Sequence, residues 1–236
     1  MQTLIDIKNV SKSFGKKVIF KNFDLKIEEG QRVALMGANG CGKTTLVEMI
    51  AQFSKPDSGD IKINLTENIK QEIGIQLQEG NWPTGITAQN MLDFYKFVYP
   101  KFTKEWETKL KEVFEIDEFI NRPLKKLSGG QRQRFNAMIS IMNNPKIIIL
   151  DELTTGLDME LQFKIIDFFK KNTKEFKQTL LLVSHHPEEV EEMCNRLIII
   201  KDSKIWYDDS VENTVKKYES VRKLMNKFFK GEKYND

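Results

Sequence analysis

The sequence predicts an α/β fold: a core with a mostly parallel sheet, an antiparallel β layer and an inserted α-helical subdomain. Residues 3–10 and 18–27 alternate apolar with polar side chains, as half-buried strands do. Later apolar runs, such as residues 147–150 and 180–183, are uninterrupted and predict buried parallel strands alternating with helices. Between these two regions the apolar residues change to helical spacing.

The elements expected in chain order are two antiparallel strands (3–10, 18–27), a buried strand (33–36), a helix (44–50), two short strands (60–64, 73–77), helices within 87–141, a strand (147–150), a helix (163–176), two strands (180–183, 197–200) and a helical C-terminal stretch from Val211. Pro100 and Pro123 punctuate the helical insertion. We therefore expect a catalytic core of residues 1–86 and 142–210. The helical subdomain covers about 87–141, and a basic helical tail covers 211–236.

Composition limits the class of protein. The 236 residues are 40% apolar and 30% charged, as in an ordinary soluble protein, and the aliphatic runs are far below membrane-spanning length. The first residues lack a secretory signal pattern, so we expect a cytoplasmic protein with Cys41 and Cys194 as reduced thiols. The net charge of +3 is matched by the basic excess of residues 211–236 alone. No nucleic-acid partner is expected.

Residues 37–45 match G-x-x-x-x-G-K-[ST] and directly follow the apolar run 33–36. Glycines in such a loop let consecutive backbone N–H groups point at phosphate oxygens, and a helix beginning at Thr44 adds the positive end of its dipole. Lys43 is expected to reach the β- and γ-phosphates, and the Thr44 hydroxyl to bind Mg²⁺. The pattern predicts a P-loop NTPase core that binds nucleotide through Gly37, Asn39, Gly40, Cys41, Gly42, Lys43, Thr44 and Thr45.

A second motif narrows the class. Residues 127–134 read Leu-Ser-Gly-Gly-Gln-Arg-Gln-Arg, which resembles the L-S-G-G-Q signature of the ATP-binding cassette (ABC) ATPases. A serine hydroxyl and glycine amides ahead of a helix that begins near Gln131 make a second anion-binding element. The resemblance implies that Ser128, Gly129, Gly130 and Gln131 contact ATP.

From this motif the resemblance extends over almost the whole chain. Asp151 and Glu152 follow the apolar strand 147–150 and resemble the family's Walker B acids, which implies that Asp151 organises Mg²⁺ and Glu152 is the general base. Asp158 falls in a segment similar to the D-loop, which communicates between paired sites. His185 is followed at the family's spacing by Glu189 and resembles the switch histidine, whereas His186 lacks that spacing and is expected to be a surface residue.

Two further positions complete the expected ATP site. Residues 73–79 resemble the family's Q-loop, in which Gln78 would touch Mg²⁺, and Gln76 is the competing candidate. Phe14 lies where the family places an aromatic ring against adenine, with a core role as the alternative.

The resemblance implies an ATPase that uses ATP and Mg²⁺ and needs a second ATPase subunit, identical or different, because the P-loop of one chain pairs with the signature of another. Separate transmembrane permease subunits would place the protein on the inner face of the cell membrane. The leading hypothesis is a subunit that powers a transporter, specifically an exporter. The alternative is a soluble ABC ATPase such as an iron–sulfur cluster assembly ATPase. A regulatory module without turnover is disfavoured because Glu152 and His185 are both present.

Overall fold

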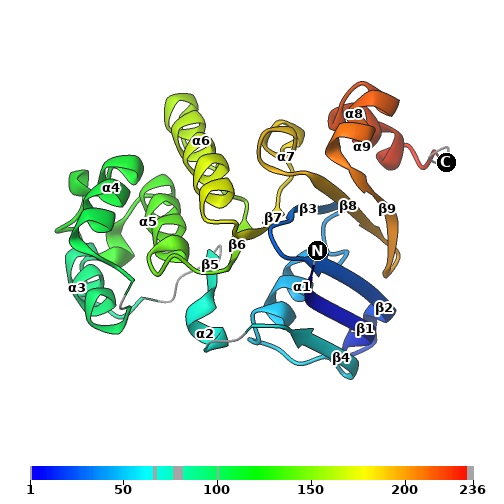
Figure 1. The fold of residues 1–236 in the computed structure, drawn as a ribbon, viewed down its shortest axis with the longest axis horizontal. Helices are drawn as coiled ribbons and strands as arrows, with labels where there is room; N and C mark the ends of the chain where they lie inside the picture. Colours follow the sequence, from blue (N-terminus) through cyan, green and yellow to red (C-terminus); the bar gives the residue numbers. More distant parts are fainter. Residues whose placement is uncertain (1, 66–67, 77–81, 100, 233–236) are drawn as a thin grey trace.

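The computed structural model describes residues 2–65, 68–76, 82–99 and 101–232. Two sheets form the scaffold (Figure 1). The smaller sheet is antiparallel, in the order β2-β1-β4, and the larger has the order β5-β6-β7-β3-β8-β9. All neighbours in the larger sheet are parallel except β8 and β9. The predicted α/β class, with a mostly parallel sheet and an antiparallel layer, is confirmed.

The strands are β1 (Thr3–Phe14), β2 (Lys17–Glu28), β3 (Arg32–Gly37), β4 (Ser58–Ile63), β5 (Ile73–Gln76), β6 (Ile147–Asp151), β7 (Thr179–Val183), β8 (Arg196–Lys201) and β9 (Lys204–Ser210). The helices are α1 (Lys43–Ile50), α2 (Ile69–Glu72), α3 (Ala88–Val98), α4 (Lys104–Phe114), α5 (Gly129–Ile141), α6 (Met159–Glu175), α7 (Pro187–Met193), α8 (Val211–Tyr218) and α9 (Val221–Phe229). Two short 3₁₀ turns, Ile116–Glu118 and Leu124–Lys126, connect α4 to α5.

The inner parallel strands β3, β6, β7 and β8 are mainly apolar because both faces of the larger sheet are covered. One face, which includes Val33 and Leu35, packs against α1 and the antiparallel sheet. The other face, which includes Ala34 and Met36, packs against α5, α6, α7 and α9. Alternate residues of β3 therefore belong to two separate cores, and β3 lies inside the sheet as its apolar sequence predicts.

The helical segment α3 to α5 gathers at one end of the molecule, and α8 and α9 lie at the opposite end (Figure 1). In the part of the chain that the structure describes, no helix combines the length and apolar character needed to cross a bilayer.

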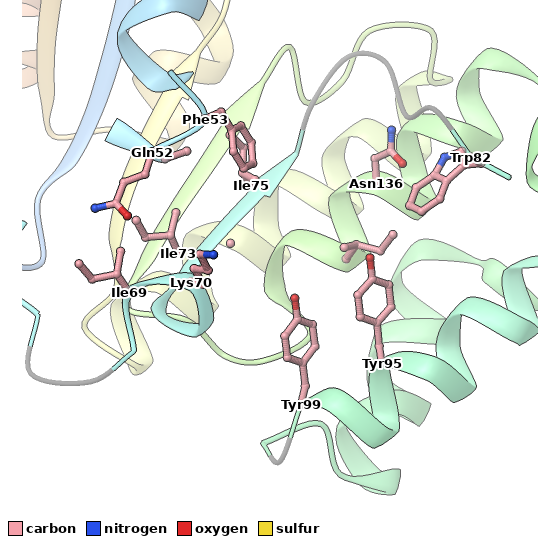
Figure 2. A pocket seen from close by; sticks show the side chains of 13 residues that line it. Gln52, Phe53, Ile69, Lys70, Ile73, Ile75, Trp82, Tyr95, Tyr99 and Asn136 are labelled. Carbon is pink, nitrogen blue, oxygen red and sulfur yellow. The ribbon is translucent and has the colours of Figure 1, made fainter. Parts of the chain in front are cut away.

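A groove of about 530 Å³ lies between the edge of the larger sheet and α3. Phe53 and Ile75 lie on the sheet side, and on the other lie Tyr95 of α3 and Tyr99, which directly follows that helix (Figure 2). The two tyrosine rings stack with centroids 5.2 Å apart. On the exposed surface of the same helix, Phe97 leaves 90% of its side chain accessible. The groove and this helix face together form an aromatic surface on the helical segment.

Candidate active site

The loop between β3 and α1 has the backbone that its glycines permit. Gly37, Gly40 and Gly42 have positive φ angles of 141°, 73° and 109°. A Cβ atom on Gly42 would lie 2.6 Å from Cγ2 of Ile19, and one on Gly37 would lie 2.4 Å from the carbonyl oxygen of Ile200. Both positions therefore exclude a side chain as well as requiring glycine conformations.

Lys43 begins α1 and is buried, with 6% of its surface exposed. Its Nζ donates to the carbonyl oxygens of Gly37 at 3.0 Å and Ala38 at 3.2 Å. The ammonium group therefore lies inside the curve of the loop, next to the N-terminus of the helix. Positive charge and helix dipole coincide there, which suits a phosphate anion.

A cavity of about 500 Å³ opens in front of this loop, at the carboxyl ends of parallel strands. It brings together predicted residues from three separate parts of the chain, among them Lys43, Thr44, Asp151, Glu152 and His185. Asn39, Gly40, Gly42 and Thr45 line it as well. The loop, the end of β6 and the end of β7 thus meet at one polar cavity.

Asp151 is the last residue of β6 and is 3% exposed. Its Oδ2 accepts a hydrogen bond from Oγ1 of Thr44 at 3.4 Å. Burial, and then the charge of Glu152, raise the pKa of Asp151 to about 6. A buried carboxylate beside a hydroxyl matches the oxygen ligands that Mg²⁺ prefers.

The described residues contain no group of three or more His, Cys, Asp or Glu side chains arranged to hold a metal ion. A cation here would therefore need ligands from the nucleotide in addition to Asp151 and Thr44, as Mg²⁺ in phosphate-transfer sites does. The donor set fits Mg²⁺ bound together with a nucleotide.

Glu152 follows Asp151 with a φ angle of 57°, which is unusual for a residue with a side chain. Its Oε1 lies 3.3 Å from Nε2 of His185, and its Oε2 accepts from Oγ1 of Thr155 at 2.9 Å. Burial, and then the positive charge of Lys43, lower the pKa of His185, so the imidazole is neutral near pH 7. The pair combines a carboxylate with a neutral imidazole at the mouth of a phosphate cavity.

Glu189 joins the two loops that carry this pair. Its carboxylate accepts from Oγ1 of Thr154 and, at 2.5 Å, from Oγ of Ser184. Thr154 follows Glu152 by two residues, and Ser184 directly precedes His185. Glu189 is 3% exposed and lies in α7. In the sequence, the spacing of Glu189 from His185 was the only signal of a function for this residue.

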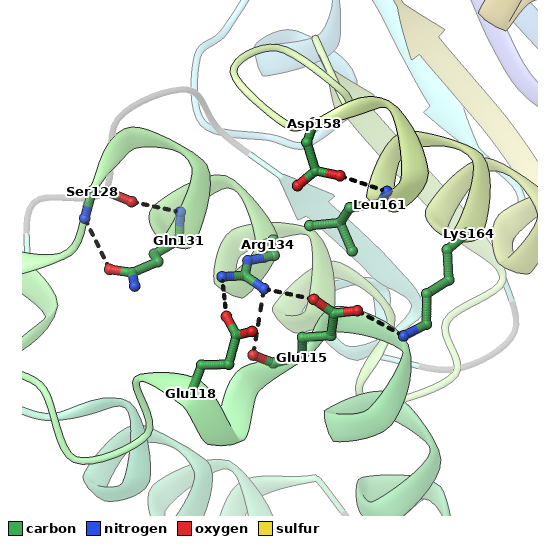
Figure 3. Close-up of polar contacts among 8 residues, drawn as sticks. All are labelled: Glu115, Glu118, Ser128, Gln131, Arg134, Asp158, Leu161 and Lys164. Atoms are coloured by element: carbon green, nitrogen blue, oxygen red, sulfur yellow. Dashed lines mark hydrogen bonds and ion pairs between the residues drawn. The ribbon is translucent and has the colours of Figure 1, made fainter.

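The second motif caps α5. Oγ of Ser128 accepts from the backbone N–H of Gln131 at 3.2 Å, and Oε1 of Gln131 accepts from the N–H of Ser128 at 3.1 Å (Figure 3). This reciprocal cap starts the helix at Gly129, two residues before the predicted start near Gln131. Asp158 caps α6 with a single hydrogen bond, which its carboxylate accepts from the N–H of Leu161 at 3.0 Å.

Neither cap belongs to the phosphate cavity of this chain. Ser128, Gly129 and Asp158 are exposed, and none of them lines the cavity around Lys43. The signature and the P-loop are thus separate surfaces of one chain.

The remaining predicted residues do not line the phosphate cavity or lie outside the described residues. Phe14 is 53% exposed, which excludes the core role, and it does not line the phosphate cavity. Gln78 lies outside the described residues, whereas the competing Gln76 is fully buried in β5. His186 is exposed, as predicted, and lies outside the phosphate cavity. Cys41 and Cys194 are free thiols.

Two residues in this region were not singled out from the sequence. Lys17 lines the phosphate cavity, and its Nζ lies 3.2 Å from where a Cβ on Gly40 would be. Nothing distinguished it from neighbouring surface lysines. Gln133 lies in α5, and its side-chain amide donates to the carbonyl oxygens of Glu152 and Leu153. Its position two residues after the signature was the available signal.

Comparisons with known proteins agree with this geometry. Residues 20–155 match the family model described as ABC transporter. The petrobactin import ATP-binding protein FpuD of Bacillus anthracis is 29% identical over 91% of this chain and 84% of that protein. The linearmycin resistance ATP-binding protein LnrL of Bacillus subtilis is 33% identical over 84% of this chain and 66% of that protein. Several further curated relatives are named import ATP-binding proteins.

Among solved structures, the dimeric post-hydrolysis state of the ATP-binding cassette MJ0796, bound to ADP and Pi, is 30% identical. It superposes with a TM-score of 0.75 over 88% of this chain and 98% of that chain.

Proposed function

Because this chain belongs to the ABC transporter family as an ATP-binding, ATP-hydrolysing subunit, we propose that it powers a membrane transporter through an ATP-dependent dimer. One observation supports the proposed dimer. A complete phosphate cavity and an intact, exposed signature occupy different surfaces of the same chain. Within one chain the signature does not reach the phosphate cavity. In a dimer, the signature of each chain would close the phosphate cavity of the other, so two chains would form two complete ATP sites.

In the proposed mechanism, the loop amides and Lys43 hold the β- and γ-phosphates of ATP at the start of α1. Thr44 and Asp151 would hold Mg²⁺, which would neutralise charge on those phosphates. Glu152 accepts a proton from water as the water oxygen bonds to the γ-phosphorus and the bond to the β-phosphate oxygen breaks. Neutral His185 has a single N–H, and with Nε2 3.3 Å from Oε1 of Glu152 that N–H orients the carboxylate.

The second ATP-binding surface comes from the partner subunit. Ser128 and the amides of Gly129 and Gly130 would close on the γ-phosphate held by the other chain, with the positive end of α5 behind them. Phe14 would stack on adenine, and Gln78 would contact Mg²⁺. The partner is a second ATPase subunit, identical or different.

The aromatic surface of the helical segment is the proposed contact with separate transmembrane permease subunits. Its groove is predominantly apolar and opens beside β5, close in sequence to Gln78. A cytoplasmic segment of a permease inserted between Phe53 and Tyr99 would bury the groove (Figure 2). This contact would hold the ATPase at the inner face of the membrane. Loss of co-purification with membrane subunits in Tyr99→Asp, but not in Lys171→Asp on α6, would support it.

The direction of transport is the finer part of the proposal. The sequence favours an exporter. LnrL, which is named for resistance to linearmycin, is compatible with export. FpuD and other relatives are named for import, so direction is to be measured in reconstituted vesicles. The soluble cluster-assembly alternative is not favoured, because FpuD and other curated relatives are named as transport proteins.

Glu152→Gln tests the proposal. The amide cannot accept the proton, so we expect ATP to bind and to trap a dimer that does not turn over. Light scattering with ATP and Mg²⁺ should show a doubled mass, and phosphate release should be lost. The matched control is Glu175→Gln, at the exposed end of α6, which should hydrolyse ATP as the wild type does. Phosphate release by Glu152→Gln at the wild-type rate would refute the assignment of the base.

A further inference from the structure

Gln133 connects the signature helix to the proposed catalytic base within one chain. Its Nε2 donates to the carbonyl oxygen of Glu152 and, at 3.2 Å, to that of Leu153. One amide group on α5 thus holds two consecutive carbonyls that follow β6. The contact spans 19 residues in the sequence and joins the helical segment to the catalytic core.

These hydrogen bonds act on a residue with an unfavourable backbone conformation. Glu152 has a φ angle of 57°, and its N–H donates to the carbonyl oxygen of Val183 at 2.8 Å. The amide side of Glu152 is therefore anchored to β7, while its carbonyl side is anchored to Gln133. With a left-handed backbone between two anchors, the direction of the carboxylate depends on the position of α5.

Further contacts join α5 to the loop after Glu152 and to α6. A Cβ atom on Gly130 would lie 2.9 Å from the carbonyl oxygen of Gly156, so the helix start touches the D-loop. Arg134, 7% exposed, pairs with Glu115 at 3.2 Å, and Glu115 also pairs with Lys164 of α6 at 2.9 Å (Figure 3). Helix α5 therefore contacts the loop 152–158 at Glu152 and Leu153 through Gln133 and at Gly156 through Gly130.

We propose that Gln133 is a positioning residue that couples the two ATP sites of the dimer. This inference rests on the proposed function, in which Ser128 at the start of α5 completes the site of the partner chain. When ATP held by the partner chain contacts Ser128, it fixes the position of the start of α5. Gln133 on the same helix then fixes the carbonyl group of Glu152, and so orients the Glu152 carboxylate in the ATP site of its own chain. Occupation of one site would then prepare the base of the other.

Two substitutions remove the donor and keep the length of the side chain. Gln133→Met has no donor, and Gln133→Glu would place a carboxylate against two carbonyl oxygens. We expect kcat to fall about tenfold in the Met variant, the equivalent of one neutral hydrogen bond, and further in the Glu variant. ATP affinity should remain within about twofold of the wild type, because no nucleotide contact changes. We expect the Hill coefficient for ATP hydrolysis to exceed unity in the wild type and to fall toward unity in both variants.

Gln162→Met is the matched control. Gln162 also donates its side-chain amide to this loop, to the carbonyl oxygens of Leu157 at 2.8 Å and Thr154 at 3.3 Å, but from α6, which carries no signature. Its loss should lower the midpoint of thermal unfolding and preserve the Hill coefficient. If Gln162→Met reduces cooperativity as much as Gln133→Met does, Gln133 only stiffens the loop and the coupling is refuted.

The outcomes separate the two proposals. If Glu152→Gln forms no ATP-dependent dimer, the proposed function fails, and the coupling fails with it. If the dimer forms while Gln133→Met keeps wild-type kcat and cooperativity, only the coupling fails. A hyperbolic dependence of wild-type hydrolysis on ATP concentration, with the dimer present, also refutes the coupling alone.

Discussion

Nε2 of His185 lies 3.3 Å from Oε1 of Glu152, although the two residues follow different strands of the larger sheet. The buried carboxylate of Glu189 holds the two loops at this separation. It accepts hydrogen bonds from Thr154, two residues after Glu152, and from Ser184, directly before His185. The geometry of the proposed base thus depends on a side chain that does not line the phosphate cavity.

Substitution of Glu189 should impair hydrolysis more than ATP binding. In Glu189→Gln the amide cannot accept from both hydroxyls as the carboxylate does, so we expect a loss of about 1–3 kcal/mol in the free energy of unfolding. We also expect kcat to fall about tenfold, the rate equivalent of one misplaced hydrogen bond, with ATP affinity retained. Denaturant titration and steady-state kinetics measure the two effects.

The neighbouring Glu188 provides the control. Its side chain is 61% exposed and pairs with Arg222 at 2.5 Å. Because exposed ion pairs contribute about 0–1 kcal/mol, Glu188→Gln should change stability and turnover little. Equal losses in both variants would contradict the special role of Glu189.

His185 should titrate below the ordinary histidine value of about 6.5. Burial and the charge of Lys43 lower its pKa, so between that lowered value and 6.5 the unfolded chain binds more protons than the folded one. The contribution of His185 to stability is therefore complete above about pH 6.5 and is lost as pH falls through its folded pKa. The chain has two histidines, so His186→Gln leaves a single imidazole for titration by NMR. A midpoint at or above 6.5 would contradict the geometry.

Lys17 should add to ATP binding through charge alone. Its ammonium group lies at the edge of the phosphate cavity beside Gly40, but it is exposed to solvent. We expect Lys17→Met to weaken ATP binding about two- to fivefold at low salt, with a smaller effect at high salt. Lys16→Met in the same hairpin is the control, since Lys16 does not line the cavity. Calorimetry at two salt concentrations checks this, and equal effects of both variants would exclude a specific role.

Two glycines should respond oppositely to alanine. A Cβ on Gly42 would meet Ile19 at 2.6 Å and Phe20 at 2.7 Å, so Gly42→Ala should destabilise the fold by about 1–3 kcal/mol and abolish ATP binding. A Cβ on Gly129 would meet nothing within 4 Å in this chain. Gly129→Ala should therefore keep stability within about 1 kcal/mol and retain ATP binding.

Hydrolysis should nevertheless fall in Gly129→Ala, because the free space in front of the helix is needed by the partner's nucleotide. Wild-type turnover by Gly129→Ala, measured by phosphate release at saturating ATP, would contradict the shared site.

The strands inside the larger sheet were predictable because both of their faces are buried. Residues 33–36 and 147–150 are uninterrupted apolar runs, and no other environment suits them in a chain of this composition. The edge strand β9 was missed, since Lys204–Ser210 mixes aromatic with acidic residues and pairs with β8 alone. Helix α7 was also missed because seven residues are too few for a clear helical period.

The sequence by itself determined the fold class, the P-loop and the order of the motifs. Each of these is local: glycine spacing, a lysine at a helix start, or acids directly after an apolar run. The tertiary structure alone decided that Glu189 bridges Thr154 to Ser184 and that Gln133 holds Glu152. Those hydrogen bonds join residues 5 to 35 positions apart through single polar side chains. Such contacts leave no periodic or compositional signal in the sequence. Only the packing of α5 and α7 against the sheet brings the atoms within hydrogen-bond distance.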